Sequence, residues 1–127
     1  MDKILALIEQ YDAQKHCYIM STNDAVLAYV RERNPGIALC AGHQGFDPYG
    51  LVDRAIRFGY EKVQLFKPYF NQEMIDKARA HGVKLNVFFS DDAEETRRYL
   101  DMGVDTILTN DYQRTANAVK EWQSERR

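Results

Sequence analysis

The sequence predicts an α/β fold in which five parallel strands alternate with helices in a single domain, residues 1–127. Four glycines, Gly36, Gly59, Gly82 and Gly103, recur at spacings of 23, 23 and 21 residues, and each precedes a short apolar run. A glycine just past a helix accommodates the left-handed backbone that ends it, so this period has room for one helix, one loop and one strand. The runs are nearly continuously apolar, which is typical of strands covered by helices.

Helices are predicted from apolar residues spaced three and four apart and from capping residues at their starts. Asn71 precedes one helix, and Asp91 or Asp92 precedes the next. Asp47-Pro48 combines an N-cap with a first-turn proline, and Asn34-Pro35-Gly36 ends the helix before it. In chain order the helices are expected over residues 3–14, 24–33, 51–58, 72–81, 93–102 and around 116–122.

Strands are predicted where an apolar run is too short for a helix and ends in polar residues. In chain order they are expected over residues 17–20, 37–40, 62–66, 84–89 and 104–108. A parallel return needs a helix-length crossover, so strict alternation makes these strands parallel. Their carboxyl ends then share one edge, where functional residues gather in α/β proteins. The polar residues expected there are Ser21, Thr22, Asn23, His43, Gln44, Lys67, Ser90, Asp91, Thr109, Asn110 and Asp111.

Composition and charge argue against several classes of protein. The net charge is −2, and no cluster of lysine and arginine indicates nucleic-acid binding. No apolar run approaches the roughly 20 residues that span a bilayer, and the first residues lack the features of a signal peptide. Cys17 and Cys40 have no metal-ligand spacing, so buried reduced thiols are expected. These features together predict a cytoplasmic protein.

Two segments near the C-terminus resemble a known family. Residues 80–92, AHGVKLNVFFSDD, resemble the penultimate strand of glycerophosphodiester phosphodiesterases, which finishes in a Trp-Thr-x-Asn-like segment. Residues 102–110, MGVDTILTN, resemble the closing strand, usually Gly-Val-Asp-Gly-Ile-Ile-Thr-Asp. Residues 18–22 match a mid-barrel strand of the family more loosely. The resemblance implies a TIM (βα) barrel, of which this chain corresponds to strands four to eight, so a truncated, partial barrel is expected.

The family's catalytic motifs are missing from the sequence. No His-Arg-Gly and no Glu-x-Asp occurs, and Glu61-Lys62 stands at the start of a strand instead of its functional end. The resemblance implies a Ca or Mg cofactor in a complete barrel, but no catalytic residue and no metal site is expected in this chain. Three interpretations stay open: an inactive family member that binds its ligand weakly, one chain of a split enzyme completed by a partner, or a non-catalytic binding or assembly module.

Three residues are candidates for contacting a substrate. Phe88 stands where the family usually has a tryptophan that lines the glycerol pocket. His43, between glycines in a loop after a strand, can donate to a phosphate or act as an acid, or is a half-exposed loop histidine. Lys67 lies just past its strand, where it can contact a phosphate or be solvated.

Other polar and aromatic residues have simpler explanations. Asp91, Asp92 and Asp111 are better explained as helix N-caps than as metal ligands. Most of the aromatic residues are expected in the core, whereas Tyr69 and Phe70 are expected to line a pocket or an interface.

Partner predictions follow from an open barrel, which leaves two strand edges and an inner face uncovered. We expect a homo-oligomer, such as a domain-swapped dimer that covers the edge at residues 17–20, or a complementary half-barrel chain. The expected ligand is a small phosphodiester from glycerophospholipid metabolism. Neither nucleic acid nor a membrane span is expected.

Overall fold

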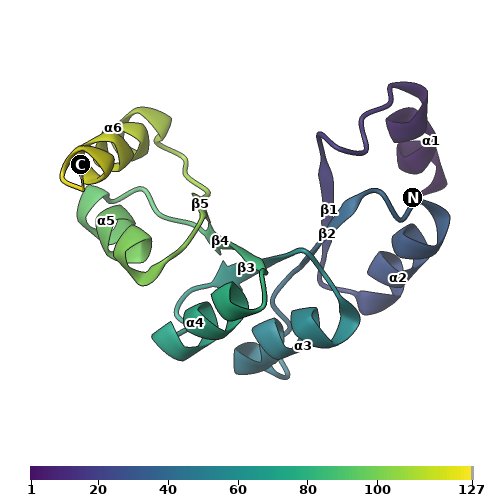
Figure 1. Cartoon of the computed structure of the whole chain (residues 1–127), viewed down its shortest axis with the longest axis horizontal. Helices are drawn as coiled ribbons and strands as arrows, with labels where there is room; N and C mark the ends of the chain where they lie inside the picture. The colour runs from purple at the N-terminus through teal and green to yellow at the C-terminus, as the bar shows by residue number, and fades with distance from the viewer. Residues whose placement is uncertain (127) are drawn as a thin grey trace.

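A computed structural model describes residues 1–126 as one five-stranded parallel sheet, with the strands side by side in chain order (Figure 1). The strands are β1 (Tyr18–Ser21), β2 (Ala38–Ala41), β3 (Lys62–Phe66), β4 (Lys84–Phe88) and β5 (Thr106–Ile107). The helices are α1 (Asp2–Gln10), α2 (Asp24–Arg33), the short 3-10 helix η1 (Pro48–Gly50), α3 (Leu51–Phe58), α4 (Gln72–Ala80), α5 (Ala93–Met102) and α6 (Tyr112–Ser124). The predicted alternation of strands and helices is confirmed.

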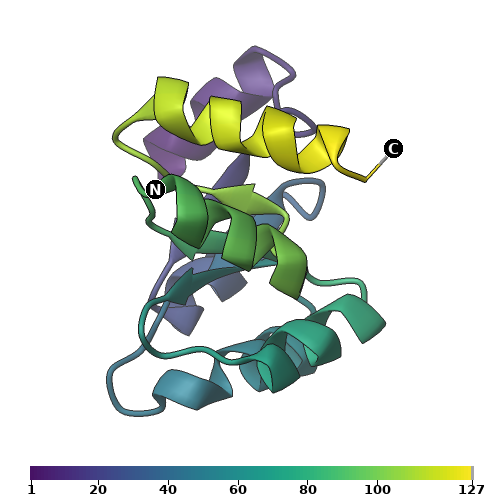
Figure 2. The same ribbon diagram turned by 90° about the vertical axis from the view of Figure 1, so that its left-hand side faces the viewer.

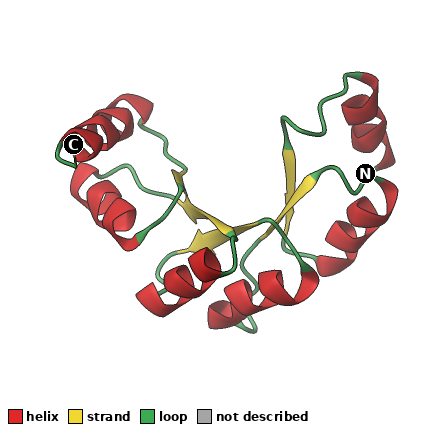
Figure 3. Ribbon diagram, viewed as in Figure 1, coloured by secondary structure: helices red, strands yellow, loops and turns green. Residues whose placement is uncertain are grey.

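The sheet is an open arc. Strands line its inner side and helices its outer side, and the two chain ends lie at opposite ends of the arc (Figure 3). Along the outer layer, α3 packs against α4, and α5 packs against α6, which lie side by side in Figure 2. None of the helices in residues 1–126 has the length and apolar character needed to cross a membrane.

Two elements are shorter than predicted by more than one residue. Helix α1 ends at Gln10 and not at residue 14, because Asp12 takes a positive φ of 50° and the chain turns. Strand β5 covers Thr106–Ile107 and not 104–108. Its predicted first residue, Val104, donates its N–H to the carbonyl of Tyr99 and so belongs to the end of α5.

The prediction that a glycine follows the end of each of four helices in a left-handed conformation is confirmed in part. Gly59, Gly82 and Gly103 have positive φ values of 73°, 72° and 109°, as the glycine period predicts. Gly36 does not take this conformation, because Asn34 already ends α2 by donating its N–H to the carbonyl of Val30.

The capping predictions had a mixed outcome. Asn23 caps α2, Asn71 caps α4, and Asp92 and Asp111 cap α5 and α6 with their side chains. The N-cap predicted at Asp47 is wrong in one respect, because its side chain makes no capping hydrogen bond and the segment begins as a 3-10 helix.

The hydrophobic core lies between the sheet and the helices. Along β3 and β4, Val63, Leu65, Leu85 and Val87 are fully buried in this layer. Their sequence neighbours point to the opposite, concave face, because successive strand residues alternate between faces. The parallel register places the concave-face residues opposite one another, as in the pairs Gln64 with Asn86 and Phe66 with Phe88.

The concave face is polar near its centre. Asn86, only 1% exposed, donates its amide to the Tyr18 hydroxyl at 3.2 Å, which connects β4 to β1 across the arc. The Lys62 ammonium lies 5.1 Å from the centre of the Tyr18 ring. Tyr18 of β1 therefore contacts side chains of β3 and β4 from across β2.

Candidate functional site

Five ring side chains gather at the carboxyl edge of the sheet. Phe66 and Phe88 end β3 and β4, and their rings stack with centres 6.2 Å apart. Phe89 meets Phe88 edge-to-face at 5.5 Å. The remaining two rings are His43, from the loop after β2, and Tyr69, from the loop after β3. We call these five residues the edge aromatic cluster.

His43 lies flat across two of these rings. Its imidazole centre is 4.9 Å from that of Phe66 and 5.2 Å from that of Tyr69, with interplanar angles of 24° and 15°. Phe66 and Tyr69 are themselves only 6.3 Å apart and nearly parallel. The rings of His43, Phe66 and Tyr69 therefore stack with nearly parallel planes.

The edge aromatic cluster is accessible. Phe66, Tyr69, Phe88 and Phe89 expose 39%, 39%, 40% and 37% of their surfaces. Most of the aromatic residues were expected in the core, and for Phe66 and Phe89 this expectation is wrong. The sequence did contain a signal for the exposure of Phe66. Side chains alternate between the two faces of the sheet along β3, so Phe66 shares the concave face with Lys62 and Gln64.

Tyr69 contributes a ring to this cluster, whereas its neighbour Phe70 turns away from it. Phe70 is half-buried and packs against Tyr99 of α5, with ring centres 5.4 Å apart. Tyr69 and Phe70, which were both expected to line a pocket or an interface, therefore point to different sides of the loop.

Lys67 is held by an ion pair. Its ammonium lies 2.7 Å from the carboxylate of Glu95 and 5.4 Å from the centre of the Phe89 ring. The hydrogen bond with Glu95 raises the pKa of Lys67. Burial acts to raise the pKa of Glu95, but hydrogen bonds from Lys67 and Ser90 and the charges of Lys67 and Arg98 together lower the pKa below its ordinary value. The positive charge at the rim of the cluster is therefore partly neutralised.

Asp91 joins the ends of β4 and β5 and does not cap a helix. Its carboxylate accepts from the Thr109 hydroxyl at 2.8 Å and from the Asn110 backbone N–H at 2.6 Å. The hydrogen bonds from Asn110 and Thr109 hold the pKa of Asp91 below its ordinary value. The Thr109 oxygen in turn accepts from the N–H of Asp111, so the closing segment is fixed against β4.

The carboxylates of this edge do not fit a Ca or Mg site. Such a cation takes several oxygen ligands at one point, but Asp91 is engaged by β5, Asp92 and Asp111 cap helices, and Glu95 pairs with Lys67. Within residues 1–126, no three histidine, cysteine or acidic side chains lie close enough together to hold a metal ion.

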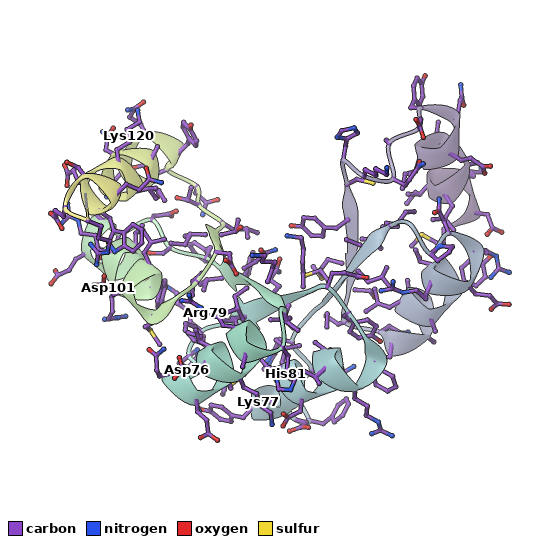
Figure 4. All side chains as sticks on the ribbon, viewed as in Figure 1. Asp76, Lys77, Arg79, His81, Asp101 and Lys120 are labelled. Atoms are coloured by element: carbon purple, nitrogen blue, oxygen red, sulfur yellow. The ribbon has the colours of Figure 1, made fainter. Side chains whose placement is uncertain are left out.

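The other two histidines lie away from this edge. His16 precedes β1, and His81 ends α4, where its Nδ1 lies 2.9 Å from the carbonyl of Lys77. Figure 4 shows His81 beside Lys77 on the outer side of the arc. Both positions are at the opposite ends of the strands from the edge aromatic cluster.

We expect Asp91→Asn to reduce the loss of stability in acid. The folded pKa of Asp91 lies below the unfolded value of about 3.9, so its contribution is complete above that value and disappears as pH falls through the folded pKa. Urea unfolding from pH 7 to pH 3 should show the unfolding free energies of the wild type and the variant converging below about pH 4.

Asp76→Asn is the control, because the Asp76 carboxylate accepts from Gln72 on the exposed face of α4. It should follow the wild-type pH dependence, and a constant difference between Asp91→Asn and the wild type would contradict the prediction.

Sequence comparison identifies relatives of this chain. The sequence profile of the Glycerophosphoryl diester phosphodiesterase family matches residues 1–114. A glycerophosphodiester phosphodiesterase of Caldanaerobacter subterraneus subsp. tengcongensis is 29% identical over 124 residues, covering 94% of this chain and 49% of the relative. This chain thus spans about half the length of the curated relative that it matches.

Solved structures share the fold. A candidate glycerophosphoryl diester phosphodiesterase of Silicibacter pomeroyi DSS-3 superposes with a TM-score of 0.85 at 19% identity, over 94% of this chain and 43% of that one. An Oleispira antarctica phosphodiesterase, solved in complex with the product sn-glycerol-3-phosphate, gives a TM-score of 0.70 at 18% identity, over 80% of this chain and 40% of that one. Both similarities support the same partial barrel.

Proposed function

Because the chain belongs to the Glycerophosphoryl diester phosphodiesterase family, we propose that its edge aromatic cluster is the substrate-contacting wall of a glycerophosphodiester site. The observation that carries this proposal is the convergence of Phe88, His43 and Lys67, from three separate loops and strands, on one accessible edge. Exposed ring faces bind the C–H surface of a polyol, and a nearby ammonium favours a phosphate. The relative from Oleispira antarctica was solved with sn-glycerol-3-phosphate, which makes this compound the natural probe.

Hydrolysis requires more than these residues supply. Cleavage of a phosphodiester by this family's route needs a divalent cation held by carboxylates and an acid that protonates the leaving alkoxide. The carboxylates at this edge already cap helices, accept a hydrogen bond from Asn110 or form an ion pair with Lys67. We therefore propose that residues 1–127 do not hydrolyse phosphodiesters unaided, and that metal-binding carboxylates from further polypeptide are needed. Turnover of sn-glycero-3-phosphocholine by the purified chain with Ca²⁺ or Mg²⁺ would overturn this part.

The open arc supports an association with such polypeptide. β1 and β5 each pair on one side only within the part of the chain that the structure describes, and unpaired strand edges favour strand addition. A split enzyme would gain activity when mixed with a polypeptide that carries the family's first three strands. A homo-oligomer, including a domain-swapped one, is the alternative use of the same edges, and the mass in solution distinguishes a dimer from a monomer.

Phe88→Ala is expected to weaken the binding of glycerol 3-phosphate about tenfold, because a ring that covers an apolar ligand face contributes 1–2 kcal/mol. The dissociation constant can be followed by NMR chemical shifts of the Asn110 and Phe89 amides. Phe58→Ala is the matched control, since Phe58 is also an exposed ring, at 49% against 40% for Phe88, but lies at the end of α3, on the outer layer. Equal weakening by both variants would contradict the proposed location.

A further inference from the structure

A cavity of about 500 Å³ lies outside the barrel mouth, between α5 and the loop that leads from β3 into α4. One wall is a single face of α5, formed by Glu95, Arg98, Tyr99 and Met102. These residues are spaced three and four apart, so they lie above one another along the helix. The opposite wall is the loop, which contributes Lys67 and Phe70.

The packing of the outer layer explains why this space is not filled. The helices associate as pairs, α3 with α4 and α5 with α6, so the cavity lies between the two pairs. Contacts at its margins fix its shape. Phe70 and Tyr99 meet at its base with an interplanar angle of 60°, and the Gln72 amide donates to the carbonyl of Met102 at 2.8 Å.

The charges in the cavity favour an anion. Lys67 and Arg98 both approach Glu95, at 2.7 Å and 3.6 Å, so two cations share one carboxylate and the lining keeps a net positive charge. The Arg98 side chain is 66% exposed, and its guanidinium carbon lies 5.5 Å from the centre of the Tyr99 ring. The guanidinium is therefore free to turn toward a ligand above the apolar base.

We propose that this cavity binds an organic phosphate monoester with an apolar body. The phosphate would lie between Lys67 and Arg98, where a guanidinium and an ammonium both donate to phosphate oxygens. The apolar body would pack on Phe70 and Tyr99. This site shares Lys67 with the proposed phosphodiesterase site, but its apolar base, Phe70 and Tyr99, lies outside the edge aromatic cluster.

Phenyl phosphate is the probe, because its ring matches the apolar base and its dianion matches the two cations. Titration followed by NMR should give a dissociation constant near or below about 1 mM, with shifts centred on residues 67–70 and on α5. Inorganic phosphate should bind more weakly because it lacks the ring. Equal binding of the two compounds would overturn the assignment of the apolar base.

Arg98→Gln should weaken phenyl phosphate binding by about fivefold or more, since a charge-assisted hydrogen bond is lost. Arg57→Gln is the matched control, because Arg57 also lies over the ring that follows it, 5.3 Å from the centre of Phe58, but on α3. Glu95→Gln should strengthen binding, because the carboxylate that competes for both cations is removed. Unchanged binding in Arg98→Gln would overturn the site.

Phe88→Ala separates this site from the proposed function. It should leave phenyl phosphate binding unchanged while it weakens glycerol 3-phosphate. Loss of phenyl phosphate binding in Phe88→Ala would show that the probe binds at the edge aromatic cluster, and would overturn the proposal. If glycerol 3-phosphate does not bind at all but phenyl phosphate binding depends on Arg98, the phosphodiesterase proposal fails and the cavity site stands.

Discussion

Leu65→Ala is expected to lower the free energy of unfolding by about 3 kcal/mol, within the range of 2–5 kcal/mol that buried leucines show. Leu65 is fully buried at the centre of β3, the middle strand of the arc, with helices on its side of the sheet. Truncation removes apolar surface from the core and leaves a cavity, because close-packed neighbours relax only in part. Urea unfolding followed by circular dichroism measures the change through the midpoint.

The neighbouring residue provides the control for this prediction. Gln64→Ala changes the same strand, but Gln64 is half-buried on the concave face. A loss well under 1 kcal/mol is expected there, as at most positions away from the core. If Gln64→Ala costs as much as Leu65→Ala, the core does not lie between sheet and helices as described.

Glu61→Ala is expected to lower the free energy of unfolding by about 2 kcal/mol, because a charged hydrogen bond to a buried group is lost. Glu61 precedes β3, and one carboxylate oxygen accepts the backbone N–H of Leu39 at 2.8 Å. Both oxygens also lie within 2.8 Å of the Arg31 guanidinium, so one side chain joins α2, β2 and β3. Leu39 is fully buried, and its N–H would lose its partner.

Two further variants test this interpretation of Glu61. Glu61→Gln keeps an acceptor oxygen for the Leu39 N–H and loses only the charge, so its unfolding free energy should fall between those of the wild type and Glu61→Ala. Glu32→Ala removes an exposed carboxylate from α2 and should leave the midpoint almost unchanged. Identical midpoints for Glu61→Ala and Glu32→Ala would show that the bridge contributes nothing.

Glu61 also illustrates what could not be predicted from the sequence. Its position at the start of a strand was visible in the sequence, and this position placed it away from the functional end of the sheet. Its hydrogen bond to Leu39 depends on the register between β2 and β3, which no local pattern specifies. Asp105 repeats the arrangement before β5, where its carboxylate accepts the N–H of Leu85 at 2.9 Å. The amino edge of the sheet is therefore joined by acidic side chains that look like ordinary surface residues in the sequence.

In the candidate site, too, single residues could be predicted from the sequence, but their contacts could not. Phe88 was predicted from its place in a family motif, and His43 from its glycine-flanked loop. The sequence did not predict that His43 lies across Phe66 and Tyr69, because three separate loops and strands must first converge. Likewise, Asp91 was expected to cap a helix, and its engagement with Asn110 requires β5 to lie beside β4.

The sequence by itself determined the alternation of strands and helices, the family, and most of the helix ends. These features depend on residues near one another in the chain, such as glycines with positive φ and the caps Asn71 and Asp92. Only the tertiary structure decided which aromatic rings are accessible, how Lys67 is paired, and where a cavity lies between the helix pairs. The physical reason is that these properties depend on strand register and on the packing between helices, which bring together residues distant in sequence.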